Sequence, residues 1–115
     1  MIKRLNEMKS EEKSKLGGNG NGSAHVTYLL TQDETQGKCR ICNLMTVHPG
    51  TSVSLHTHEK DCEIYYLLEG ELFVTDNGKE SVMKGGDIMF TGISENHSAE
   101  NRSSHDAKLL AIVIN

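Results

Sequence analysis

Two histidines one residue apart, with a glutamate five positions further on, form the stretch of this sequence best suited to chemistry: His56, His58 and Glu63. The residues around the histidines alternate between apolar and polar types, which is typical of a β-strand, where residues i and i+2 point to the same face. Both imidazoles should therefore project together. If residues 62–68 form the next strand and pair antiparallel, Glu63 lands beside them. Two imidazoles and one carboxylate on rigid strands are suitable metal ligands.

A fourth ligand is expected downstream, and His97 supplies it after a glycine turn and a short strand, residues 86–90. Glu63 and His97 lie far apart in the sequence, so only a closed or sandwiched sheet can bring them to the other two histidines. A set of three histidines and one glutamate leaves coordination positions open for water or a ligand. We therefore predict one divalent metal ion, without distinguishing iron, manganese, nickel, zinc, cobalt or copper.

The spacing of these residues resembles the two cupin motifs. The first, G-x5-H-x-H-x4-E-x6-G, is matched at every fixed position; the residues are Gly50, His56, His58, Glu63 and Gly70. The second, G-x5-P-x-G-x2-H-x3-N, is matched at Gly86, His97 and Asn101. It departs in the turn before the last ligand, where Gly92 replaces the proline and Ser94 replaces the glycine. The resemblance covers about residues 40–114 and is closest to small single-domain bacterial cupins.

This resemblance implies an all-β fold, a double-stranded β-helix or jelly-roll barrel with the metal near its centre, and usually a homodimer. Cupins include isomerases, decarboxylases or lyases, and dioxygenases, so the fold does not choose a reaction. We expect a metal-dependent enzyme acting on a small organic or carbohydrate-like substrate chelated at the metal. The alternative is a non-catalytic cupin that binds or senses a small ligand with the help of the metal.

The pattern of the chain predicts one short helix followed by strands. Helical spacing of apolar residues suggests a helix over residues 1–16, ended by Gly17-Gly18. From residue 24 onward, short segments of β-type composition are separated by turn residues. The predicted strands are Val26–Leu30, Cys39–Val47, Val53–His58, Cys62–Glu69, Glu71–Thr75, Glu80–Met83, Asp87–Phe90, His97–Asn101 and Ala107–Ile114. We thus expect residues 1–23 to pack on the barrel or on a partner, and residues 24–115 to form the cupin domain.

The glycine-rich segment, residues 17–22, has two interpretations. It either tethers the helix to the outside of the barrel or to a partner subunit, or it places glycine amides at the mouth of the pocket. We favour the tether, because a glycine-rich run without strand and helix flanks is a weak signal. Val26–Leu30 offers an edge strand that a second subunit could cover, so we predict a homodimer with the N-terminal segment at the interface.

Composition excludes several classes of protein. A chain of 115 residues is long enough for one domain with its own core. The net charge of −4 gives no basic footprint for nucleic acid. No apolar run is long enough for a membrane span and no signal peptide is evident, so we expect a cytoplasmic protein. Three cysteines argue against a disulfide framework, and Cys39 and Cys42 should point to opposite faces of one strand.

Further residues near the predicted site carry weaker expectations. Tyr65 shares a face with Glu63, so its phenol is a candidate catalytic proton donor or relay, although a core tyrosine is the commoner role for such a residue. Arg40 is the only arginine within the barrel strands. The absence of an arginine pair favours a small neutral or singly charged ligand held mainly by the metal. His25, His48 and His105 match no motif, and Cys62 should face away from Glu63.

Overall fold

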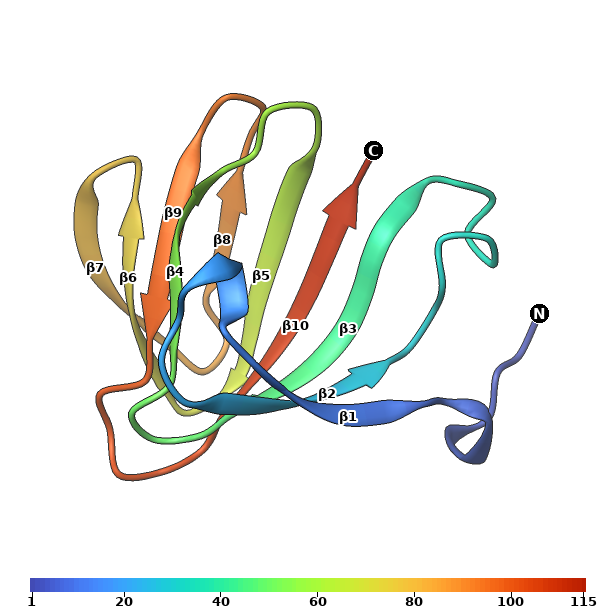
Figure 1. Ribbon diagram of the computed structural model, residues 1–115, viewed down its shortest axis with the longest axis horizontal. Coiled ribbons are helices and arrows are strands. Elements are labelled where there is room, and N and C mark those ends of the chain that lie inside the picture. Colours follow the sequence, from blue (N-terminus) through green and yellow to red (C-terminus); the bar gives the residue numbers. More distant parts are fainter.

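Two antiparallel sheets face one another across a common core in the computed structural model, which describes residues 1–115 (Figure 1). One sheet has the strand order β1-β2-β3-β10-β5-β8 and the other the order β4-β9-β6-β7. The strands are β1 (Ser10–Ser14), β2 (Ser23–Tyr28), β3 (Cys39–Val47), β4 (Ser52–Thr57), β5 (Cys62–Glu69), β6 (Glu71–Asp76), β7 (Lys79–Lys84), β8 (Ile88–Thr91), β9 (Asn96–Glu100) and β10 (Ala107–Ile114). The all-β architecture predicted from the sequence is confirmed, and each of the nine predicted strands is present.

Alternation along the strands builds the core. In β10, Ala107, Leu109, Ala111 and Val113 are buried, whereas the residues between them are less so. Successive side chains of a strand point to opposite faces, so one face of each sheet supplies the interior. The core joins residues of both sheets, including Leu72 of β6. This packing fixes the positions of the strands that carry the predicted ligands.

The helix predicted over residues 1–16 is wrong. The N-terminal region contains only two short 3-10 turns, Leu5–Glu7 and Leu16–Gly18, with strand β1 between them. No helix of the structure has the length and apolar character needed to cross a bilayer. The apolar residues that suggested the helix bury little surface: Ile2 is 73% exposed and Leu5 81% exposed. Most helical stability comes from packing an apolar face, so a helix with exposed apolar residues has little to stabilise it. The segment instead uses the ladder of hydrogen bonds that β2 offers.

The N-terminal strand also changes the expected edges of the barrel. β1 pairs with β2 from Ser10 opposite Thr27 to Ser14 opposite Ser23, so β2 lies between β1 and β3. The prediction that Val26–Leu30 forms a free edge is therefore wrong. β1 and β8 are the edge strands of this sheet. The homodimer itself stays a prediction, as does the division into residues 1–23 and 24–115.

Residues 10–22, here called the N-terminal strap, run along the barrel and turn back over β4 (Figure 1). The glycines let the strap approach β4 closely. Gly17 has φ +70°, and a Cβ there would lie 2.6 Å from the carbonyl oxygen of Ser54. A Cβ at Gly20 would overlap the carbonyl of Ser52. Since only glycine tolerates both the backbone conformation and the space at position 17, these residues keep the strap against the barrel.

A β-bulge in β3 overturns the expectation for Cys39 and Cys42. Along β10, Val113 pairs with Ile41 and the next residue, Ile114, pairs with Cys39, so Arg40 is the extra residue. Such a bulge shifts the alternation of side chains by one. Cys39 and Cys42 therefore lie on the same face rather than on opposite faces. All three cysteines are free.

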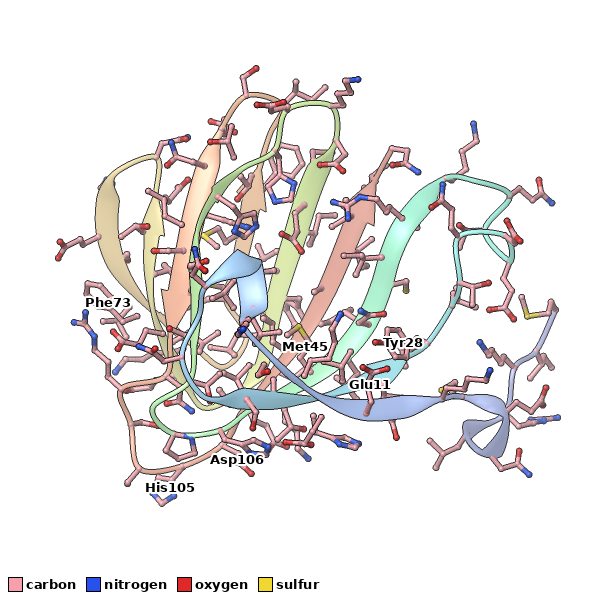
Figure 2. The ribbon with its side chains drawn as sticks, in the orientation of Figure 1. Glu11, Tyr28, Met45, Phe73, His105 and Asp106 are labelled. Carbon is pink, nitrogen blue, oxygen red and sulfur yellow. The ribbon has the colours of Figure 1, made fainter.

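His48 ties the strap to two loops of the barrel. Its Nε2 lies 2.7 Å from Glu12 Oε1 in β1, and its Nδ1 lies 3.1 Å from Asp106 Oδ1. Asp106 lies in the loop between β9 and β10 (Figure 2). The other Glu12 oxygen lies 2.8 Å from His25 Nδ1. Hydrogen bonds to Asp106 and to Glu12 raise the pKa of His48 above its ordinary value.

We expect this contact to stabilise the fold on the acid side of neutrality. A raised folded-state pKa means that the stabilisation is complete below the unfolded pKa, about 6.5, and is lost as pH rises through the folded value. His48→Gln should therefore lower the melting temperature more at pH 5.5 than at pH 8.5. The difference should be on the order of a degree or two, because exposed ion pairs contribute little. Thermal melts at the two pH values measure it, with the exposed His105→Gln as control; an equal loss at both pH values would contradict the assignment.

Candidate metal centre

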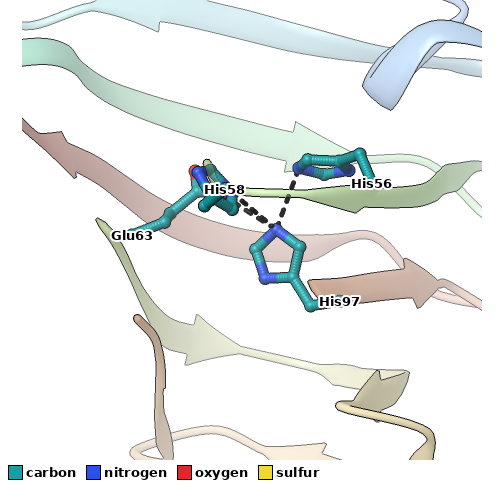
Figure 3. A group of neighbouring side chains, drawn as sticks. All are labelled: His56, His58, Glu63 and His97. Carbon is teal, nitrogen blue, oxygen red and sulfur yellow. Dashed lines mark hydrogen bonds and ion pairs between the residues drawn. The ribbon is translucent and has the colours of Figure 1, made fainter. Parts of the chain in front are cut away.

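Four side chains converge at the inner face of the barrel: His56, His58, Glu63 and His97 (Figure 3). His97 Nε2 lies 3.0 Å from His56 Nε2 and 3.3 Å from His58 Nε2. Glu63 Oε1 lies 3.0 Å from Nε2 of both His58 and His97. All four donor atoms lie within 4.8 Å of one another, so the cluster could hold one metal ion.

Strand pairing explains why these four residues meet. His56 lies on β4 and pairs directly with His97 on β9, while His58 follows β4 by one residue. Glu63 lies on β5 in the opposite sheet. Directly opposed residues of an antiparallel pair point to the same face, which places His56 and His97 side by side. The cluster therefore spans the two sheets.

The second nitrogen of each imidazole has a partner that fixes the ring. His56 Nδ1 donates to the carbonyl oxygen of Ser54 at 2.8 Å, because a carbonyl only accepts. His58 Nδ1 lies 2.7 Å from Asp61 Oδ1, and His97 Nδ1 lies 2.8 Å from Thr91 Oγ1. Partners of this kind orient metal-binding histidines and set their tautomer. With Nδ1 protonated, the Nε2 lone pairs of His56 and His58 point into the cluster.

The protonation of these groups agrees with this orientation. Burial lowers the pKa of His56, opposed by its hydrogen bond to Ser54, so the ring favours the neutral form that binds metal. Burial raises the pKa of Asp61, but hydrogen bonds from His58 and Arg40 outweigh it and hold that pKa below its ordinary value. Asp61 is therefore a carboxylate that accepts a hydrogen bond from the Nδ1–H of His58.

The donor set fits a divalent cation. Two atoms bound at right angles to one ion at about 2.1 Å lie about 3.0 Å apart, which matches the separations of the Nε2 atoms and the carboxylate oxygen. Lone pairs and a carboxylate that face one another repel unless a positive charge lies between them. Imidazole and carboxylate ligands suit several first-row metals, so the set does not select one. A bound ion would act there as a Lewis acid toward a carboxylate, a carbonyl or water.

The turn before His97 keeps its shape despite the departures from the second motif. Ser94 has φ +69°, a left-handed conformation that favours glycine. Its backbone N–H donates to the carbonyl of His58 at 2.6 Å, and the N–H of His58 donates to the carbonyl of Glu95 at 2.9 Å. The Gly92 N–H donates to Glu95 Oε1. These bonds connect the turn to His58 and position His97.

A cavity of about 350 Å³ opens onto the cluster. His56, His58 and Glu63 reach its wall, and the strap covers one side with Lys13 and Lys15. The sequence did not indicate these lysines, because they fell within the predicted helix. Gly17 also lines the cavity, as the less favoured interpretation of the glycine-rich segment expected.

Arg40 joins the two lysines on the cavity wall, and Glu63 is the one acidic residue there. The wall is thus cationic although the whole chain has a net charge of −4. A cationic wall attracts anions.

Tyr65 lies beside the cluster and lines the same cavity. Its ring stacks on His97 with centroids 4.8 Å apart, and it is 4% exposed. Burial, and then the charge of Glu63, raises the pKa of Tyr65 well above its ordinary value. The phenol therefore stays protonated near neutral pH, so it can donate a hydrogen bond but is not a base. Its catalytic role stays a prediction.

The remaining histidines lie outside the cluster. His25 and His48 take part in the contact with Glu12, and His105 lies on the exposed β9–β10 loop (Figure 2). Cys62 pairs with Ile114 on the outer side of β5, away from the cluster. Asp61 was not singled out from the sequence, and its position three residues after His58 in a charged turn is the signal that could have found it.

The fold and this cluster define the class of protein: the chain belongs to the cupin family, whose cupin domain matches residues 43–113. The oxalate-binding protein of Thermotoga maritima is 40% identical over 114 residues, which is 99% of this chain and 93% of that protein. The crystal structure of a protein described as a predicted oxalate decarboxylase, also from Thermotoga maritima, superimposes with a TM-score of 0.91 at 40% identity. It covers 99% of this chain and 98% of the other.

A more distant relative is the tetracenomycin polyketide synthase protein TcmJ of Streptomyces glaucescens. It is 29% identical over 82 residues, which is 71% of this chain and 55% of that protein. The oxalate-binding protein matches nearly the full length of both chains, so it is the more informative comparison.

Proposed function

We propose that this cupin binds a small dicarboxylate, with oxalate as the simplest candidate, at a divalent metal ion held by His56, His58, Glu63 and His97. The observation that carries the proposal is the convergence of four donor atoms beside a cavity, three of them from residues on its wall. A metal ion with open positions chelates a carboxylate directly.

The charge of the cavity supports an anionic ligand. Lys13, Lys15 and Arg40 line it, and its one carboxylate belongs to the ligand set. This pattern favours a ligand with more negative charge than the neutral or singly charged molecule expected from the sequence. The relative that binds oxalate by name is 40% identical over almost the whole chain, which agrees with the same ligand class.

The groups available for catalysis favour binding over turnover. Besides the ligand set, the titratable side chains of the cavity are the two lysines, Arg40 and Tyr65. An enzyme of this kind needs an acid or base within hydrogen-bond reach of the metal's open side. No free carboxylate or imidazole fills that role in the cavity, so we favour the non-catalytic alternative over an isomerase or a lyase that depends on such a group.

One observation favours a second candidate, a decarboxylase that converts monoprotonated oxalate to formate and carbon dioxide. The buried, protonated Tyr65 offers a hydrogen-bond donor beside the ligand cluster. The protein described as a predicted oxalate decarboxylase has the same fold at 40% identity.

Calorimetry tests the proposal. Protein loaded with manganese(II) should bind oxalate, and protein stripped by a chelator should not, because the ion supplies the main anchor. At an oxalate concentration 100 times Kd, the loaded protein should gain about 2.7 kcal/mol of stability in a thermal shift. Failure of the loaded protein to bind, or equal binding by the stripped protein, would overturn the proposal.

Carbon-13 NMR of the same samples distinguishes the two candidates: unchanged oxalate supports binding alone, and labelled formate supports the decarboxylase.

A further inference from the structure

Arg40 points into the cavity because of the bulge in β3. It is the extra residue between Cys39 and Ile41, which pair with consecutive residues of β10. Bulges beside functional sites redirect a side chain that regular alternation would place elsewhere. Arg40 and Ile41, neighbours in sequence, accordingly both line the cavity.

A chain of polar contacts connects Arg40 to the ligand cluster. Its Nε and Nη2 lie 3.0 and 2.9 Å from Asp61 Oδ2. The other Asp61 oxygen lies 2.7 Å from His58 Nδ1. The Asp61 carboxylate contacts both Arg40 and His58, so it fixes the guanidinium at a defined place relative to His58. Arg40 is therefore oriented, although its side chain is 48% exposed.

The guanidinium keeps donors free after this pairing. It carries five N–H groups in a planar fork, and the contact with Asp61 uses one on Nε and one on Nη2. The free N–H groups are available to an anion in the cavity. An arginine fork matches the geometry of a carboxylate, which a lysine ammonium does not.

Arg40 also lies where two cavities adjoin. A second cavity, of about 430 Å³, shares Arg40, Ile41 and Asn43 with the one that opens onto the ligand cluster. Lys3 and Lys9 lie on its wall, but Lys3 is paired with Glu34 at 2.8 Å. Of the cations in the two cavities, Arg40 is the one that lines both and contacts a partner of a predicted metal ligand.

We propose that Arg40 determines specificity for dicarboxylates, by binding the carboxylate oxygens that the metal does not hold. This inference rests on the proposed function, since it requires a carboxylate ligand at the metal. A dicarboxylate is then held at two points, the metal ion and the Arg40 guanidinium. A ligand with one carboxylate is held only by the metal ion, so Arg40 distinguishes dianions from monoanions.

The test compares oxalate with glycolate, which chelates metal through a carboxylate and a hydroxyl but lacks the second carboxylate. Wild type, Arg40→Gln and Arg40→Lys are loaded with manganese(II), and both Kd values are measured by calorimetry with metal content determined in parallel. Arg40→Gln should weaken oxalate binding by about 10- to 100-fold and change glycolate binding less than about threefold. Arg40→Lys should restore part of the oxalate affinity, because it keeps the charge without the fork. Arg102→Gln, whose guanidinium lies over Phe73 outside both cavities, is the matched control.

Each contrary result has a distinct meaning. Equal losses for oxalate and glycolate together with lower metal content would show that Arg40 only supports His58 through Asp61, and would overturn the inference. Unchanged oxalate binding in Arg40→Gln would overturn it while leaving the proposed function intact. Wild type that holds manganese but binds neither ligand would overturn the proposed function and this inference with it.

Discussion

His97→Ala is expected to weaken divalent metal binding by at least about 100-fold, since replacing even the partners of metal ligands costs 10- to 100-fold. His97 is the central member of the cluster: its Nε2 lies within 3.3 Å of donor atoms of the three other residues. It is 1% exposed, so water cannot easily replace it. Metal content after dialysis, measured by mass spectrometry, should fall from one ion per chain to near background.

His105→Ala is the matched control, because this histidine is exposed and lies on the loop after β9. Its metal content should equal that of wild type. Circular dichroism of both variants checks that the sheets remain folded. A folded His97→Ala protein that retains one ion per chain would remove His97 from the ligand set.

Asn101→Asp is expected to cost about 3–5 kcal/mol of folding stability, because it removes buried hydrogen-bond donors without leaving a cavity. Asn101 is fully buried. Its amide nitrogen donates to the carbonyls of Val47 and His105 at 2.9 and 2.8 Å. Its side-chain oxygen accepts from the backbone N–H and the hydroxyl of Ser103. An aspartate oxygen would face the two carbonyls instead.

Urea unfolding measures this loss. The control is Asn6→Asp, the same change at an exposed position, which should stay within about 0.5 kcal/mol of wild type. A loss below about 1 kcal/mol in Asn101→Asp would contradict the role assigned to the amide. Since Asn101 ends the second cupin motif, its contacts give a structural reason for that position: it connects the end of β3 with the β9–β10 loop.

The variants at His97 and Asn101 test two different properties, metal binding by the cluster and the stability of the fold. His97 contributes a nitrogen atom to the cluster, whereas Asn101, four residues later, contributes hydrogen bonds to the backbone. Both are buried side chains on the inner side of the barrel near β9.

Interactions local in sequence made the strands and the ligand spacing predictable. The spacing of two between His56 and His58 places both on one face, and the glycines and asparagines between apolar runs mark the turns. That this face is the inner one depends on a bulge in β4, because Val53 pairs with Ala99 and His56 pairs with His97, so two inward residues are three positions apart. The same reasoning found Glu63 and Tyr65 on one face of β5. It failed at the N-terminus, where residues 10–14 have no apolar pattern and their conformation depends on the edge of β2.

The sequence alone thus predicted the all-β class and the four residues that meet in the cluster, His56, His58, Glu63 and His97, because side-chain alternation and the cupin spacing are properties of the chain itself; that they bind a metal ion stays a prediction. Only the tertiary structure decided what surrounds the cluster. The bulge that turns Arg40 inward depends on the pairing of β3 with β10, which is far away in sequence. The strap that brings Lys13 and Lys15 to the cavity depends on the pairing of β1 with β2 and on the close approach of Gly17 to Ser54 in β4. The physical reason is that backbone register is set by the neighbouring strand, and one extra residue reverses which side chains face the cavity.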